Sequence, residues 1–225
     1  VPCETPPGQR GPKGGAVKYD VIIIGGGLHG LATAYYLAKD HGITNVAVLD
    51  KGYLGGGGSG RNTAIVRSNY LTPDGVAFYD RSLDLYNTMS ADLNLNIMFS
   101  RRGHLTLAHT DSALRTMNWR AEVNKLQGID SSVIGPDEVK RLAPSLDVST
   151  DTRYPILGAL HHPPGGVVRH DAVVWGYARG VDRMGGELHP QTEVTGIKRE
   201  NGKITGVQTT RGTINTEIVL NATAG

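Results

Sequence analysis

The sequence is nearly free of cysteine and of long apolar runs. Cys3 is the only cysteine among 225 residues, which excludes an intramolecular disulfide and a zinc site built on thiolates. No apolar run approaches the roughly 18 residues of a membrane span, and the N-terminus lacks the apolar core of a secretory signal. The net charge of +2 provides no field that would indicate nucleic-acid binding. We therefore expect a cytoplasmic protein whose partners include neither membrane nor nucleic acid.

The two ends of the chain lack features of a complete protein. The sequence does not begin with Met, and residues 1–17 are rich in Pro and Gly without a periodic apolar face, so we expect a flexible arm there. Residues 217–221 have three consecutive apolar residues at their centre, which is typical of a buried strand, and the chain stops shortly after them, at Gly225. Because a globular domain is not expected to end there, the sequence predicts truncation at the C-terminus.

Glycine is abundant, with 31 residues, and three glycines follow the first strand-like run, residues 20–24. Gly25, Gly27 and Gly30 have the spacing of a dinucleotide-binding turn: the first makes the turn, the second admits a pyrophosphate, and the third lets helix and strand pack. A second strand ends at Asp50, about 20 residues further on, where a carboxylate can accept hydrogen bonds from a ribose. This pattern predicts a dinucleotide site; a structural turn is the alternative.

The segment after Asp50 is also rich in glycine. Residues 55–58 are four consecutive glycines, followed by Ser59, Gly60 and Arg61, which suits a loop lying along a flat ligand and its phosphates. A flexible linker is the alternative interpretation. Arg67 lies in the short apolar element that follows and could bind a carboxylate through two parallel hydrogen bonds. Taken alone, such an arginine is more often a solvated or paired surface charge.

The remainder of the chain alternates helix and strand patterns. We expect a helix over 73–93, and a second helix that Asp111 caps and that runs to about 127. A third helix, short, ends before Pro144. We expect strands over 97–99, 104–108 and 157–160, a helix capped by Asp171 and ended by glycines 185–186, and a hairpin of residues 193–199 and 203–209 joined by Asn201-Gly202.

Two histidine positions invite a functional interpretation. His170 lies just before the helix that Asp171 is expected to cap, where a polar residue at a helix entry is the simpler interpretation. His161 and His162 are adjacent on an expected strand, so their side chains point to opposite faces. We therefore expect no metal site.

Three segments carry a resemblance to a known family: residues 19–38, 61–70 and 169–176. Over residues 19–225 the chain resembles the N-terminal half of the β subunit of bacterial heterotetrameric sarcosine oxidase, in the D-amino-acid-oxidase-like superfamily of FAD-dependent amine oxidases. The first segment is shared by many flavoproteins, and the other two are more specific. Asp50 stands where that family often has Glu.

The resemblance implies an α/β fold: a Rossmann-like FAD-binding domain with a parallel sheet and a β-meander, formed by residues 18–90 and 157–225. Residues 91–156 would be part of an inserted α+β substrate domain. The resemblance also implies noncovalent FAD and a covalent FMN on His170, whose imidazole nitrogen can add to the 8α-carbon of the oxidised flavin. Arg67 would bind the substrate carboxylate, with Thr63 beside the FAD ring. The cofactor-binding positions are Gly25, Gly26, Gly27, His29, Gly30, Asp50, Lys51, Gly58, Arg61, Asn62, Thr63, His170 and Val194.

The reaction implied by the resemblance is oxidative demethylation of sarcosine to glycine. FAD takes a hydride from the N-methyl group, electrons pass through FMN to oxygen, and hydrogen peroxide forms. The imine yields formaldehyde or, with tetrahydrofolate, a methylene adduct. Other sarcosine oxidase subunits are the implied partners, and we expect this part of the chain to be inactive alone. The alternatives are another FAD-dependent amine or amino-acid oxidase or dehydrogenase, for example one resembling proline dehydrogenase, and a nucleotide-binding module without catalysis.

Overall fold

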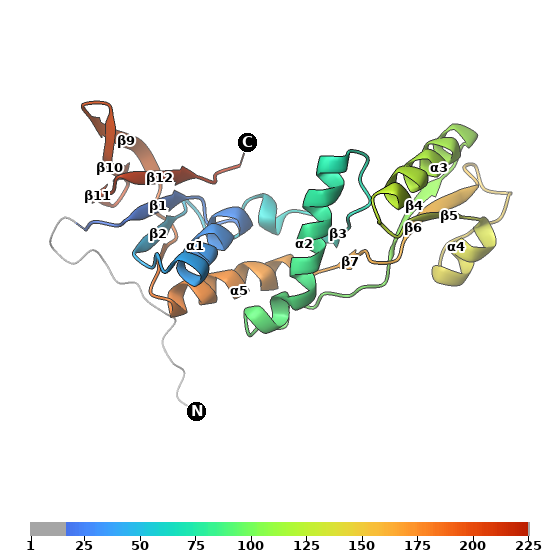
Figure 1. Ribbon diagram of the computed structural model, residues 1–225, viewed down its shortest axis with the longest axis horizontal. Helices are drawn as coiled ribbons and strands as arrows, with labels where there is room; N and C mark the ends of the chain where they lie inside the picture. Colours follow the sequence, from blue (N-terminus) through green and yellow to red (C-terminus); the bar gives the residue numbers. More distant parts are fainter. Residues whose placement is uncertain (1–16, 225) are drawn as a thin grey trace. The chain divides into compact units, whose positions relative to one another are not determined.

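The computed structural model describes residues 17–224, and the chain folds into two compact units (Figure 1). Unit 1 consists of residues 1–62 and 170–225, and unit 2 of residues 63–169. The arm expected over residues 1–17 lies, except for Val17, outside the described residues. The domain boundaries expected near residues 90 and 157 stay a prediction.

A parallel four-stranded sheet forms the centre of unit 1. Its strand order is β12-β1-β2-β8, formed by Ile218–Asn221, Val21–Ile24, Val46–Leu49 and Glu187–His189. Ile22 and Ile23 are both fully buried, as expected for a central strand whose two faces are covered. Helices α1 (Leu28–His41) and α5 (His170–Arg183) pack against each other beside the sheet (Figure 1). Gly180 allows this approach, because a Cβ there would lie 2.7 Å from the Tyr35 ring.

A three-stranded antiparallel meander forms a second layer of unit 1. It consists of β9 (Val194–Glu200), β10 (Lys203–Thr209) and β11 (Gly212–Asn215), with β10 in the centre. The turn between the first two strands has positive φ at both Asn201 and Gly202, as the dipeptide predicts. Val207 of the meander packs with Ile22, Ala47 and Leu49 of the parallel sheet. The expected Rossmann-like domain with a parallel sheet and a β-meander is thereby confirmed.

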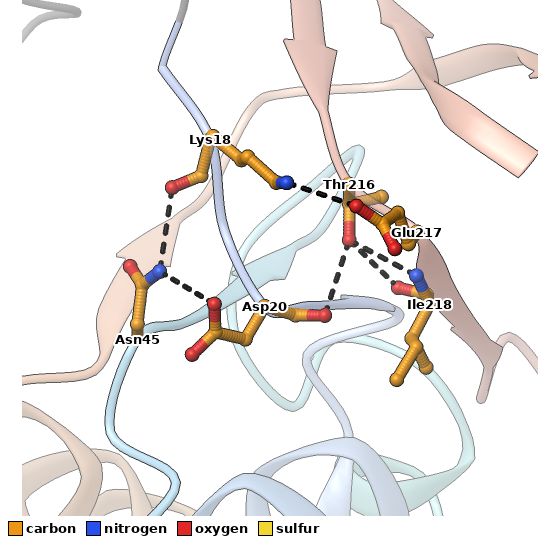
Figure 2. A network of polar contacts seen from close by, with 6 residues as sticks. All are labelled: Lys18, Asp20, Asn45, Thr216, Glu217 and Ile218. Carbon is orange, nitrogen blue, oxygen red and sulfur yellow. Dashed lines mark hydrogen bonds and ion pairs between the residues drawn. The ribbon is translucent and has the colours of Figure 1, made fainter.

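A polar network joins the entrances of three parallel strands (Figure 2). Asn45, just before β2, donates from Nδ2 to the Asp20 carboxylate (3.2 Å) and to the Lys18 carbonyl (3.4 Å). Thr216, just before β12, donates from Oγ1 to the Asp20 carbonyl (3.4 Å). Lys18 also pairs with Glu217 at 2.9 Å, but this pair is exposed and contributes little to stability. The network thus holds neighbouring strands together at the end opposite to the glycine turn.

Unit 2 contains a three-stranded sheet with a helix on each face, and a smaller two-stranded sheet. The three-stranded antiparallel sheet has the order β4-β6-β5, formed by His104–Ala108, Gly158–His162 and Ser132–Ile134. Helix α3 (Asp111–Leu126) packs on the face that carries Leu160, and α4 (Pro136–Leu142) on the face that carries Ala159. Strands β3 (Ile65–Val66) and β7 (Gly166–Val167) pair antiparallel, and α2 spans Pro73–Asp92.

Several local expectations need correction. Residues 97–99 do not form a strand, because Met98 has φ +55° and interrupts an extended backbone. Thr110, not Asp111, caps α3, since its side chain accepts a hydrogen bond from the Ala113 N–H. Asp171 lies in the first turn of α5, which begins at His170. Strand β12 has a single neighbour, β1, among the described strands, and it is partly exposed rather than buried.

Candidate cofactor and substrate sites

The glycine turn of unit 1 leaves no space for side chains. Gly25 has φ +111°, and a Cβ there would lie 2.5 Å from the Ala222 carbonyl oxygen. A Cβ at Gly30 would overlap the carbonyl oxygen of Gly25. Gly27 is the N-cap of α1, which has no acidic residue in its first turn. The helix therefore presents its positive end, without a carboxylate to neutralise it, beside a bare backbone.

Asp50 lies next to this turn and is fixed by two backbone amides. The Gly26 N–H donates to one carboxylate oxygen at 2.7 Å, and the Gly52 N–H donates to the other at 2.8 Å. The backbone of Asp50 joins the segment after β8, because it donates to the His189 carbonyl and accepts from the Thr192 N–H. Each carboxylate oxygen retains a second lone pair for a hydroxyl donor. The acid at the end of β2 is therefore held beside the turn, as the spacing of the sequence predicts.

Ser59 was missed as a site residue at the sequence level. Its Oγ accepts a hydrogen bond from the Leu28 N–H at 2.9 Å, so a serine from the glycine-rich loop caps the N-terminus of α1. A Cβ at Gly27 would lie 3.0 Å from this hydroxyl. The loop itself contains a short 3-10 helix, Gly58–Gly60, and Asn62 donates to the carbonyls of Gly58 and Ser59. The loop is thus folded against the turn and is not an open linker.

The other predicted cofactor residues of unit 1 are distributed around this turn. His29, on α1, is exposed, and the exposed loop positions are Lys51, Gly58, Arg61 and Asn62. Val194 begins β9 and packs against the core that contains Leu49. His170 is the half-buried first residue of α5. The structure therefore brings the glycines and Asp50 together. Among the described residues, the side chains of His29 and Lys51 form no hydrogen bond or ion pair with the glycines or with the Asp50 carboxylate.

A partly buried polar group supports the segment beside Asp50. The Tyr19 hydroxyl donates to Glu187 at 2.8 Å, and the His189 ring lies 3.2 Å from the same carboxylate. Burial, together with the hydrogen bond to Glu187, raises the pKa of the Tyr19 hydroxyl. Burial also lowers the pKa of His189, against the opposing effect of Glu187. These residues fix the end of β8, whose last carbonyl holds the Asp50 amide.

In unit 2, Arg67 lies in an irregular segment directly after β3. Its Nη1 donates to Asn69 Oδ1 at 3.0 Å, and its guanidinium carbon lies 4.4 Å from the centre of the Tyr70 ring. Tyr70 in turn stacks on Tyr79 of α2, with ring centres 3.9 Å apart. The predicted neighbour Thr63 is exposed at the start of unit 2. Arg67 is therefore half-buried and oriented by aromatic and amide groups, unlike a freely solvated arginine.

Three side chains from distant elements hold residues 68–70. Arg120 of α3 donates from Nε and Nη2 to the Asn69 carbonyl, the first at 2.8 Å. Asn124, one turn further along α3, donates to the Tyr70 carbonyl at 2.7 Å. The His162 ring contacts the Ser68 amide through Nε2 at 3.3 Å and the Asp130 carbonyl through Nδ1 at 2.7 Å. Because a carbonyl only accepts, Nδ1 carries the proton and Nε2 accepts from Ser68.

The electrostatics of this cluster favour an anionic ligand. Among residues 17–224, neither Arg67 nor Arg120 forms an ion pair with a carboxylate. Burial, reinforced by the positive charge of Arg67, lowers the pKa of His104 to about 4. Burial likewise lowers the pKa of His162. Near neutral pH the two histidines are therefore uncharged, and the guanidinium groups provide the positive charge.

Histidine and acidic side chains do not gather as metal ligands in the part of the chain that the structure describes. No group of three or more His, Cys, Asp or Glu side chains there is arranged to hold a metal ion. His161 and His162 occupy consecutive positions of β6, whose side chains point to opposite faces of the sheet, and His162 is fully buried in the contact with Ser68. No helix among residues 17–224 is long and apolar enough to cross a membrane.

Comparison with known proteins places both units in one family. Residues 20–225 match the family model described as FAD dependent oxidoreductase (DAO). The chain belongs to this family. It is 48% identical over 208 residues to the sarcosine oxidase subunit beta of Arthrobacter sp, a match that covers 92% of this chain and 51% of that protein. It is 52% identical over 198 residues to the subunit of the same name from Rhodobacter capsulatus, covering 88% and 48%. The resemblance inferred from the sequence is thereby confirmed.

The fold also matches solved structures. The L-proline dehydrogenase of P. horikoshii superposes with a TM-score of 0.84 at 30% identity, over 92% of this chain and 53% of that one. The chain thus spans about half the length of the relatives that it matches. The residues present fit FAD: the glycine turn has no space for side chains, the start of α1 is not neutralised by an acid, and Asp50 is held beside them.

Proposed function

We propose that this chain belongs to the β subunit of a sarcosine oxidase, which demethylates sarcosine oxidatively to glycine. The observation that carries the proposal is the extent of the identity. About half of the residues are shared with sarcosine oxidase β subunits over about nine tenths of the chain, which includes most of both units. Because the chain spans about half of those relatives, the reaction is proposed for the whole protein.

Unit 1 would hold FAD noncovalently. The bare backbone of Gly25, Gly26 and Gly27 would receive the pyrophosphate at the start of α1, and Gly30 would let α1 pack closely on the turn. Asp50 would accept hydrogen bonds from the ribose, using the lone pairs that its backbone contacts leave available. Further contacts are proposed for His29, Lys51, Gly58, Arg61, Asn62, Thr63 and Val194. When bound, the flavins would supply the redox chemistry, FAD as the hydride acceptor and FMN as the carrier of electrons to oxygen, with hydrogen peroxide as the product.

Arg67 would bind the carboxylate of sarcosine in unit 2. A guanidinium can form two parallel hydrogen bonds with a carboxylate, and Arg67 meets no carboxylate of this chain among the described residues. The stacked Tyr70 and the amide of Asn69 hold the guanidinium in one orientation. Arg67 would therefore orient the substrate, and Thr63 would lie near the flavin ring.

His170 would carry the covalent FMN through an imidazole nitrogen. The half-buried position of His170 at the first turn of α5 leaves part of the residue accessible. The remaining partners of the proposal are the other sarcosine oxidase subunits, oxygen, and tetrahydrofolate as an acceptor for the one-carbon unit. A cytoplasmic location stays a prediction.

The experiment that tests this proposal uses the full-length subunit assembled with its partners. After acid denaturation, released FAD is expected together with FMN attached to the peptide that contains His170. Replacing His170 with Ala should remove the covalent flavin and retain the released FAD, whereas His41→Ala, an exposed control at the end of α1, should change neither. A covalent adduct in the His170→Ala protein would contradict the assignment.

An L-proline dehydrogenase is the second candidate. It is favoured by the structural match to the enzyme of that name from P. horikoshii, although the identity there is 30% against about one half for the sarcosine oxidase subunits. Steady-state turnover by the assembled protein separates the two. We expect oxidation of sarcosine with release of peroxide, and a preference for proline would replace the sarcosine proposal.

A further inference from the structure

Residues 67–70 form a buried irregular segment, and its position depends on side chains from elsewhere in unit 2. Ser68 and Asn69 are fully buried although they belong to no helix or strand. An irregular segment of this kind has no regular backbone ladder, so other groups must satisfy its buried polar atoms. Arg120 does this for the Asn69 carbonyl, which accepts from both Nε and Nη2 of the same guanidinium.

Asn69 links the two arginines. Its backbone carbonyl is held by Arg120, and its side-chain Oδ1 accepts from Arg67 at 3.0 Å. A movement of the Asn69 backbone would therefore move the group that orients Arg67. The two guanidinium groups also repel each other. Burial lowers the pKa of Arg120, and the nearby positive charge of Arg67 lowers it further. Such an arrangement is costly unless an anion joins it.

A buried donor in the same cluster lacks an acceptor. Asn69 Nδ2 is inaccessible and has no hydrogen-bond partner among the described residues. An unsatisfied buried amide N–H destabilises a protein by about 1–3 kcal/mol, and native structures contain few of them. A carboxylate supplies acceptor oxygens and negative charge together. Asn124 Oδ1, in the same cluster, also has no partner among the described residues, so it is the positive charge of the two arginines that indicates an anion.

We propose that Arg120 is a positioning residue for carboxylate recognition: it fixes Asn69, through which Arg67 is oriented, and it adds a second positive charge to the carboxylate site. This inference rests on the proposed function, since it deepens the role assigned to Arg67. Arg120 acts through Asn69, and its own Nε and Nη2 are already used by the Asn69 carbonyl. It determines how tightly a carboxylate binds, not how fast the bond to hydrogen breaks.

The test uses three variants of the full-length chain in its assembled complex: Arg120→Gln, Arg120→Lys and Arg115→Gln. Arg115 is the matched control, because it lies on the same helix, carries the same charge and is exposed. Two quantities are measured with each variant: KM and kcat for sarcosine, and the dissociation constant of acetate from the change in flavin absorbance. Acetate has the carboxylate without the amine, so it reports on anion binding alone.

For Arg120→Gln we expect KM for sarcosine and the acetate dissociation constant to rise by about tenfold or more, with kcat changed by less than about twofold. Arg120→Lys retains the charge but not the pair of hydrogen bonds to the Asn69 carbonyl, so it should restore part of both affinities. Arg115→Gln should match the wild type. FAD content and the thermal midpoint of each variant identify general damage. If Arg120→Gln does not fold, the test rests on Arg120→Lys, whose KM for sarcosine and acetate dissociation constant should both lie above those of Arg115→Gln.

Unchanged affinities relative to Arg115→Gln would overturn the inference, as would a fall in kcat at constant KM. The proposed function fails separately: a wild-type complex that does not oxidise sarcosine would refute it, whereas the acetate titration would still test the role of Arg120 in anion binding.

Discussion

At the scale of single residues, the glycine turn is the least tolerant part of unit 1. A Cβ at Gly30 would occupy the space of the Gly25 carbonyl oxygen, which is backbone and cannot rotate away. Replacing Gly30 with Ala should therefore separate α1 from β1 and lower both the FAD content and the thermal midpoint of the full-length protein. Both are measured on purified protein, the first by flavin absorbance after acid release.

Gly57 provides the control for this substitution. It lies in the glycine-rich loop, its φ is negative, and a Cβ there would meet no atom within 4 Å. Gly57→Ala should therefore retain FAD and thermal stability close to those of the wild type. If Gly30→Ala bound FAD as well as Gly57→Ala, the close packing of helix and strand at Gly30 would not be needed for the site.

At the scale of secondary-structure elements, α3 matters because it carries Arg120 and Asn124. Its N-terminus is capped by Thr110, whose Oγ1 accepts the Ala113 N–H at 3.1 Å. Thr110→Ala removes this acceptor and should lower the free energy of unfolding by about 1 kcal/mol. Hydrogen exchange at the Ala113 amide should become faster in that variant, while Thr110→Ser, which keeps the hydroxyl, should preserve slow exchange. Equal exchange rates in the two variants would exclude Thr110 as the cap.

Elements that depend on contiguous residues were predictable from the sequence. Three such elements are present in the structure: the strand before Gly25, the strand before Asp50 and the Asn201-Gly202 turn. Each is determined by a few residues that are adjacent in the sequence. The strands β5 and β8 were missed, because each has three residues, too few to display a period.

The parts of the candidate sites that were missed depend on long-range contacts. His162 meets Ser68 across 94 positions, and Arg120 meets Asn69 across 51. Nothing in the residues next to His162 or Arg120 indicates these partners, since the pairing of β4 with β6 and the packing of α3 decide them. Ser59 is different, because its place in the glycine-rich loop was a usable signal. A polar residue among glycines near the glycine turn is a candidate for capping the helix that begins there.

At the scale of the whole molecule, we expect one buried and two half-buried histidines to make stability depend on pH. The pKa values of His104, His162 and His189 are all lowered, in each case chiefly by burial, and that of His104 falls from 6.5 to about 4. In the unfolded chain these rings take up a proton near pH 6.5, whereas in the folded chain they resist it. The unfolded state therefore binds more protons below that pH, and stability falls as the solution is acidified.

We expect the thermal midpoint of the full-length protein to fall between about pH 7 and about pH 5, a window in which ordinary carboxylates remain ionised. His104→Gln should reduce this fall, because it removes a ring that burial and the nearby Arg67 keep uncharged and whose Nδ1 has no partner among the described residues. His41→Gln, which changes an exposed ring at the end of α1, should retain the wild-type slope. An equal slope in the two variants would show that His104 does not contribute, and a flat wild-type profile would show that protonation of His104, His162 and His189 is not linked to unfolding.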